Sequence, residues 1–170
     1  MNKEQEEILQ QRFRRLRFVA IFSLINIGFD LLNQIQSWIV GPLSSEKLEA
    51  SIQQSKELAK SMGVQESAYD TFDKMYQLSR LGNANFALSH GLATVGSIVG
   101  LLGVIMMLQR KGMGFHGYII YSIIACFGLF LYVPFNSIPL VLVVINVIFS
   151  GLFILYYYMN RTWEEPKLRD

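Results

Sequence analysis

The stretch Phe18–Val40, FVAIFSLINIGFDLLNQIQSWIV, decides how the rest of the chain is interpreted. It is long and apolar enough for a transmembrane helix, because about 20 residues rising 1.5 Å each cross a hydrocarbon core about 30 Å thick. Its central part, residues 25–34, nevertheless contains Asp30, two asparagines and a glutamine. The surroundings of these polar side chains are therefore the main lead towards function.

Charged residues in this chain are few and clustered. Of its 170 residues, 52% are hydrophobic and 16% are charged, whereas a typical soluble domain has about 25% charged residues. The charges are concentrated in residues 1–17, 44–80, 109–111 and 160–170. This pattern predicts a polytopic membrane protein that contacts membrane lipids, and we expect no nucleic-acid partner.

The apolar segments predict an all-α fold, an integral membrane four-helix bundle with a helical hairpin between spans 1 and 2. The predicted parts are an N-terminal helix (1–17), span 1 (18–40), the hairpin (41–84), span 2 (86–108), a turn (109–116), span 3 (117–135), span 4 (138–159) and a tail (160–170). The first 17 residues are too long and too charged for a signal-peptide n-region, so we expect span 1 to be retained.

Lysines and arginines indicate the orientation of the spans. They gather in the N-terminal helix, in the turn after span 2 and in the tail, and four crossings place these three segments on one side. The positive-inside rule assigns that side to the cytoplasm. Both termini are therefore predicted to be cytoplasmic and the 41–84 hairpin extracytoplasmic.

The hairpin is predicted to contain two helices. Ser44 or Ser45 can cap the first, and Gly63 can end it; the second is expected from about Glu66 to Leu81. The hairpin is interpreted either as an amphipathic cover for the bundle end or as a docking surface for a partner.

Polar residues form a stripe on span 1. At 100° per residue, Asn26, Asp30, Asn33 and Gln34 fall within an arc about 100° wide, together with two serines. Facing lipid, Asp30 would cost about 2.5–3.5 kcal/mol on insertion scales. The stripe is therefore predicted to face protein or water.

Residues of other spans can join this stripe. Counting along the helices from their charged ends places Ser97 and Asn146 in the layer of Asp30, and His90 in the layer of Gln34. We predict an intramembrane polar cluster with Asn146 as the donor to Asp30 and His90 as the second candidate. Its members are Asp30, Asn26, Asn33, Gln34, His90, Ser97 and Asn146.

Span 2 presents a ridge of small residues, which let helix backbones approach closely. The ridge consists of Ser89, Ala93, Gly96, Gly100 and Gly103. Its spacing predicts close packing and leaves open whether the partner helix belongs to this chain or to another. Tyrosines near the span ends, including Tyr118, Tyr121 and Tyr157, are interpreted as membrane-interface anchors.

The residues GLLGVIMMLQRKGMGFHGYIIYSII, 100–124, are similar to the second-to-third-span region of small uncharacterised four-span inner-membrane proteins of the Bacteroidota. There a basic, glycine-containing and aromatic turn joins two helices. The resemblance implies a location in a bacterial inner membrane, and it implies no activity and no catalytic residues.

Three interpretations of Asp30 remain open: a polar clamp between helices, a site for a basic residue of a partner, or a titrating group for transport. No catalytic triad, phosphate-binding glycine loop or metal-binding carboxylate pair occurs in the sequence, so we expect no enzymatic activity, no metal and no cofactor. The preferred function is a small membrane subunit packing into a homo-oligomer or a larger membrane complex through the stripe and the ridge. The alternative is a small channel or a proton- or cation-coupled transporter using Asp30.

Overall fold

The computed structural model describes residues 3–63 and 69–161. They form α1 (Lys3–Val40), α2 (Ser45–Ser61), α3 (Tyr69–Ala84), α4 (Phe86–Leu108), α5 (Met113–Phe127) and α6 (Leu140–Met159), with short 3₁₀ helices η2 (Gly128–Leu131) and η3 (Phe135–Ser137). The predicted all-α fold is confirmed, because no strand occurs in these residues. Four helical segments are long and apolar enough to cross a membrane, namely α1, α4, α5 with η2, and α6.

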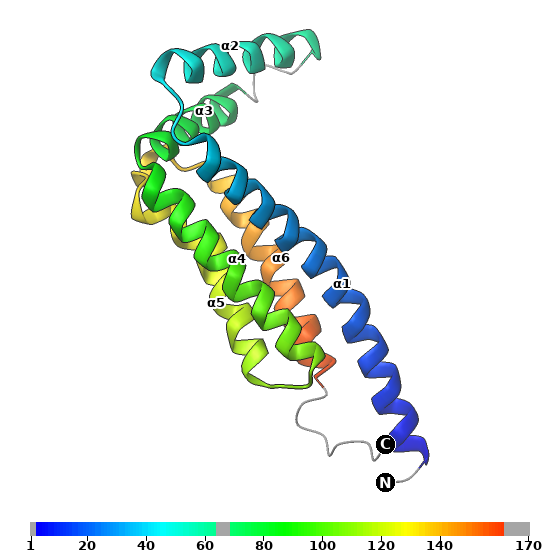
Figure 1. Ribbon diagram of the computed structural model, residues 1–170. Helices are drawn as coiled ribbons and strands as arrows, with labels where there is room; N and C mark the ends of the chain where they lie inside the picture. Colours follow the sequence, from blue (N-terminus) through cyan, green and yellow to red (C-terminus); the bar gives the residue numbers. More distant parts are fainter. Residues whose placement is uncertain (1–2, 64–68, 162–170) are drawn as a thin grey trace.

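The membrane-length helices run alongside one another, and α2 and α3 lie at one end of them (Figure 1). We call this the hairpin end. The start of α1, the α4–α5 connection and the end of α6 lie at the other end, called the turn end. This arrangement is the one expected for an integral membrane protein whose chain crosses the bilayer at each long helix.

Most predicted bounds agree with the helices. α4 has the bounds predicted for span 2, and α1 joins the predicted N-terminal helix and span 1 into one helix. α6 begins at Leu140 because Pro139, which lacks an amide donor, directly precedes it. Residues 64–68 of the predicted hairpin and 162–170 of the predicted tail lie outside the described residues.

Span 3 differs from its predicted bounds of 117–135. α5 begins at Met113, within the predicted turn, and the α-helix gives way to 3₁₀ geometry at Gly128. Pro134 then follows, and proline disfavours a helix at the residue before it. In the turn, Arg110 has a positive φ of 59°, whereas Gly114, expected in the turn, lies inside α5.

α4 and α5 are in backbone contact near the turn end. A Cβ atom on Gly103 would lie 2.8 Å from both the Gly114 carbonyl oxygen and the Tyr118 amide nitrogen. A Cβ atom on Gly114 would overlap the Gly103 carbonyl oxygen and lie 2.6 Å from the Met107 amide nitrogen. Glycine at both positions therefore sets the distance between these helices.

A closed core fills the half of the bundle near the turn end. Its fully buried side chains come from α1, α4 and α6, and they are Leu16, Ala20, Ile27, Val104, Met107 and Tyr157. The Tyr157 hydroxyl donates a hydrogen bond of 2.8 Å to the Ser23 hydroxyl, and its ring meets that of Tyr118 edge-on at 4.9 Å. This polar pair is satisfied inside an apolar core.

The hairpin covers the other end of the bundle through α3. Leu78 and Leu81 of α3 pack against the buried residues Val133, Ile138 and Val143, which belong to the connection after α5 and to α6. The Asn83 side chain exchanges two hydrogen bonds with the Leu43 backbone, of 2.8 and 2.9 Å. The segment entering α2 is thereby fixed to the end of α3.

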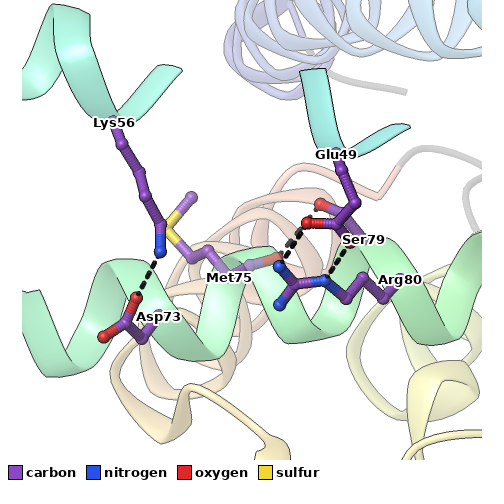
Figure 2. A network of polar contacts seen from close by, with 6 residues as sticks. All are labelled: Glu49, Lys56, Asp73, Met75, Ser79 and Arg80. Atoms are coloured by element: carbon purple, nitrogen blue, oxygen red, sulfur yellow. Dashed lines mark hydrogen bonds and ion pairs between the residues drawn. The ribbon is translucent and has the colours of Figure 1, made fainter. Parts of the chain in front are cut away.

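Two ion pairs attach α2 to α3 (Figure 2). The Arg80 guanidinium donates two hydrogen bonds to the Glu49 carboxylate, of 2.6 and 2.7 Å, and the Lys56 ammonium lies 3.3 Å from Asp73. α2 itself starts at the Ser44 cap, as predicted, and ends before Gly63, whose φ of 69° suits glycine. We call the Glu49–Arg80 and Lys56–Asp73 pairs the hairpin latch.

Candidate functional site

Asp30 lies among polar groups inside the bundle. Its carboxylate interacts with the side chain of Tyr121 on α5, and Tyr121 also interacts with Asn26, one turn earlier on α1. Asp30 is half-buried, whereas the flanking Phe29 is 64% exposed. The helix thus turns the carboxylate towards α5 and its apolar neighbours outwards, as the stripe predicted.

Two cavities meet at Asp30, and Asp30, Tyr121 and Ala125 line both of them. The first, about 300 Å³ in volume, lies between α1, α4 and α5 and extends to Leu78 of α3. We call it the hairpin-side cavity. Asp30 therefore has space on its hairpin-end side that is bounded by elements of the bundle.

The second cavity is a groove of about 600 Å³ between α1 and α6, with α5 as its floor. We call it the α1–α6 groove. Its polar lining residues are Ser23, Asn26, Asp30, Tyr118, Tyr121, Asn146 and Ser150. Asn26 on α1 and Asn146 on α6 are both exposed, so the groove presents amides on both walls.

Asn146 is not the donor to Asp30 that the sequence predicted. It lines the same groove, but within residues 3–63 and 69–161 no hydrogen bond joins the two side chains, and the side chain that interacts with Asp30 is Tyr121 of α5. Counting residues from the charged helix ends correctly predicted that Asn146 lies at the same depth as Asp30. Such counting does not show which of the neighbouring helices at that depth provides the side chain that contacts Asp30.

His90 and Gln34 do share a layer, one turn of α1 above Asp30. The His90 Nδ1 atom lies 2.6 Å from the Gln34 Oε1 atom, which joins α4 to α1. In the same region the Trp38 indole N–H donates a 3.0 Å hydrogen bond to the Thr94 hydroxyl, and the Trp38 and Phe86 rings meet edge-on at 5.3 Å. These contacts fix α1 against α4 near the hairpin end.

Two further predicted members occupy different surroundings. Ser97 is 3% exposed and lines the hairpin-side cavity with Asp30. Asn33 is exposed and lines a separate cavity of about 390 Å³ near the hairpin end, together with His90. The predicted cluster is therefore a chain of polar contacts along α1, and Asn33 lies at its side.

The small-residue ridge of α4 packs against α5 of the same chain. Cβ atoms on Gly96 and Gly100 would come within 3.0 Å of Ile124 and 2.7 Å of Tyr121, and Gly103 meets the α5 backbone. At the hairpin end, Ala93 and Ser89 line the hairpin-side cavity. The ridge's three glycines are thus covered within the chain, which answers the question that the sequence left open.

Tyrosines contribute more to the site than the sequence indicated. Tyr118 is 5% exposed and Tyr157 is fully buried, and Tyr121 contacts Asp30. These three are interior residues and not interface anchors. The signal available was that Tyr118 and Tyr121 share one helical face with Ser122 and Ala125, a face too small and polar for lipid.

Outside the spans, the hairpin latch has a defined electrostatic state. The hydrogen bonds from Arg80 lower the pKa of Glu49 below its ordinary value of 4.5, and Glu49 raises the pKa of Arg80. Among the described residues, no group of three or more His, Cys, Asp or Glu side chains could hold a metal ion.

Comparisons of the chain with protein-family models, with curated proteins and with solved structures find no match. The resemblance of residues 100–124 to Bacteroidota inner-membrane proteins therefore stays a prediction.

Proposed function

We propose that this protein is a non-enzymatic membrane subunit that binds a transmembrane helix of another polypeptide in the α1–α6 groove. The observation that carries the proposal is the polar lining of this groove, with Asn26 and Asn146 exposed on its two walls. Amide N–H and C=O groups left unsatisfied in a hydrocarbon environment are unfavourable, because lipid tails offer no hydrogen-bond partner, and Asn26, whose side chain interacts with Tyr121, has further amide groups to satisfy. A helix seated between α1 and α6 supplies partners and removes both amides from lipid.

The α1–α6 groove stays open after α4 has packed against α5. The glycines of the α4 ridge are covered by α5, so close packing against another chain through that ridge is excluded from the proposal. Phe22 and Phe149 on the groove walls are 54% and 58% exposed. Aromatic rims around polar positions give an incoming helix both contact area and hydrogen bonds.

The partner is either a second copy of this chain or a helix of a larger membrane protein. We place the subunit in a bacterial inner membrane with both termini in the cytoplasm. The support is the basic residues at the turn end, from Arg12 to Arg17, at 110–111 and at Arg161, together with the resemblance of residues 100–124.

The test uses cysteine cross-linking in the native membrane. With Cys126 replaced by alanine, Asn26→Cys or Asn146→Cys is expected to form a cross-link to a neighbouring polypeptide, identified by mass spectrometry as a second copy or another protein. Val95→Cys is the matched control, because Val95 is 55% exposed on α4, away from the groove. Equal cross-linking at Val95, or a monomer from mild detergent that shows no cross-link, contradicts the proposal.

The alternative function, a channel or a proton- or cation-coupled transporter, is favoured by one observation. Asp30 and Tyr121 line both the hairpin-side cavity and the groove, so one carboxylate borders two separate spaces. In reconstituted vesicles, Asp30→Asn abolishes flux under this alternative while assembly is retained. Under the subunit proposal, the same substitution preserves assembly and there is no flux to lose.

A further inference from the structure

The hairpin-side cavity is large enough for several water molecules and contains one charged group. Its volume is about 300 Å³, against about 30 Å³ for one water molecule in the liquid. It extends from Asp30 at mid-span to Leu78 of α3, which lies outside the spans. The cavity therefore connects Asp30 with the hairpin end, which gives a small hydrated solute a path to it.

Asp30 has no opposite charge nearby in the sequence. Along residues 18–40 and throughout α4, α5 and α6 it is the only Asp, Glu, Lys or Arg. An isolated carboxylate within a membrane is costly and usually marks a proton or ion pathway or a pairing partner. A bound cation removes that cost.

A second polar group in the cavity lacks a partner. Ser97 is 3% exposed, lines the cavity with Asp30, and its hydroxyl has no hydrogen bond to any of the described residues. Ser89, which also lines the cavity, is different, because its hydroxyl already donates to the Gly82 and Phe86 carbonyl oxygens. The Ser97 hydroxyl is therefore free to bind a solute in the cavity.

We propose that the hairpin-side cavity binds one alkali-metal cation, held by the Asp30 carboxylate and the Ser97 hydroxyl with water in the remaining positions. One carboxylate among neutral oxygens suits a single positive charge, whereas Mg²⁺ and Ca²⁺ sites generally use more carboxylates or a substrate phosphate. A protonated Asp30 alone needs only one acceptor and does not account for the unpartnered Ser97.

The packed core lies on the turn-end side of this site. Beyond Asp30 towards the turn end, the interior is filled by side chains with no exposed area, among them Leu16, Met107 and Tyr157. Asp30 also borders the α1–α6 groove, so this core bounds the site only along the bundle axis. The inference does not rest on the proposed function, because the cation lies in the hairpin-side cavity and the partner helix lies in the α1–α6 groove, and of the lining residues only Asp30, Tyr121 and Ala125 are shared.

The experiment follows carbodiimide labelling of Asp30 in the detergent-purified full chain, located by peptide mass spectrometry. Carbodiimides react with the protonated carboxyl, so a cation bound to the carboxylate slows labelling by the factor one plus its concentration over its dissociation constant. We expect NaCl or KCl to slow labelling relative to choline chloride of equal ionic strength at fixed pH. Labelling that depends on pH alone, with no difference between these salts, overturns the proposal.

Variants separate the ligands from their surroundings. Ser97→Ala is expected to remain labelled at Asp30 but to lose the protection by Na⁺ or K⁺. Ser122→Ala, which removes a buried hydroxyl of α5 outside this cavity, keeps it. Asp30→Asn verifies the labelled position. The alkali salts are expected to raise the thermal unfolding temperature above that in choline chloride in wild type and Ser122→Ala, but not in Asp30→Asn. Protection that survives in Ser97→Ala overturns the assignment of Ser97.

The pH of the labelling experiment is chosen so that the other titratable groups near Asp30 keep a constant charge. Tyr121 of α5 interacts with Asp30, Tyr132 lines the hairpin-side cavity and Tyr118 lines the α1–α6 groove. His90 of α4 contacts Gln34, which lies one helical turn from Asp30 on α1. α6 and α3 contribute no titratable side chain to either cavity. Working above the ordinary His pKa of about 6.5 keeps the charge of His90 constant across the salt series. Failure of this test leaves the cross-linking result untouched, and the reverse also holds.

Discussion

The two halves of the bundle are built on different principles. Near the turn end, glycines bring α4 and α5 into backbone contact and fully buried side chains fill the interior. Near the hairpin end, the same helices enclose a cavity lined by Asp30 and Ser97, and contacts such as His90–Gln34 join them. Close packing therefore holds the helices together near the turn end. Near the hairpin end, polar contacts join the helices around an open cavity.

The largest expected effect comes from breaking the packed half. Gly114→Leu inserts a side chain where even a Cβ atom would overlap the Gly103 carbonyl oxygen, and we expect a loss of about 3 kcal/mol or more in the free energy of unfolding. Unfolding by SDS in mixed micelles, followed by circular dichroism, measures it. Gly151→Leu on α6 is the control, since no neighbouring atom lies within 4 Å of a Cβ atom there. Similar losses at both positions would show that the α4–α5 contact is not special.

A smaller effect is expected from the hydrogen bond between Tyr157 and Ser23 in the packed half. Tyr157→Phe removes the 2.8 Å hydrogen bond to the buried Ser23 hydroxyl, which keeps its interaction with Tyr118, and we expect a cost of about 1 kcal/mol. The double variant with Ser23→Ala should be no less stable than Tyr157→Phe alone. Tyr158→Phe, at an exposed tyrosine, should change nothing; additive losses at 157 and 23 would contradict the pairing.

Substitutions in the half near the hairpin end should lower the free energy of unfolding by a still smaller amount. Replacing Gln34 by Leu removes its 2.6 Å contact with His90, and hydrogen bonds between membrane helices contribute about 0.6 kcal/mol on average. A double-mutant cycle with His90→Phe measures the coupling. A coupling as large as that of the Tyr157–Ser23 pair would mean that the two halves do not differ in this respect.

The smallest effect on global stability is expected outside the bundle, at the hairpin latch. Glu49→Gln weakens the contact with Arg80, so amide hydrogen exchange in α2 should accelerate while global unfolding stays unchanged. Because Arg80 lowers the pKa of Glu49, the contact is fully formed above the ordinary pKa of 4.5 and is lost as the pH falls below it. Acid should therefore accelerate exchange in wild type as the substitution does at neutral pH.

A matched substitution on the same helix controls for charge. Glu57 accepts a hydrogen bond from Gln53 within α2 and not from α3, so Glu57→Gln should leave the exchange rates of α2 close to those of wild type. Equal acceleration by both substitutions would assign the effect to net charge and not to the latch.

The sequence predicted what depends on regular spacing. The bounds of α4 and the inward side of Asp30 follow from apolar length and helical periodicity, and both agree with the structure. The interaction of Asp30 with Tyr121 and the inward position of the tyrosines could not be predicted in this way. The sequence near a span end looks the same whether a tyrosine lies at the membrane interface or, like Tyr157, in the core. Which of the two occurs depends on the residues that face it from the neighbouring helices.

The glycine pattern shows the same limit. The predicted turn, 109–116, includes Gly114, yet Gly114 lies within α5 and allows its close approach to Gly103. Similarly, the spacing of the ridge predicted close packing but not its partner. Periodicity indicates which face of a helix packs, and the connection lengths and side-chain volumes of the neighbours determine against what.

The Trp38 contact near the hairpin end provides an optical probe. Trp38 and Trp163 are the only two tryptophans in the sequence, so a Trp163→Phe protein emits from a single indole, which is hydrogen-bonded to Thr94 one helical turn from His90. Fluorescence of that one side chain reports on the half of the molecule where solutes enter, without any added label.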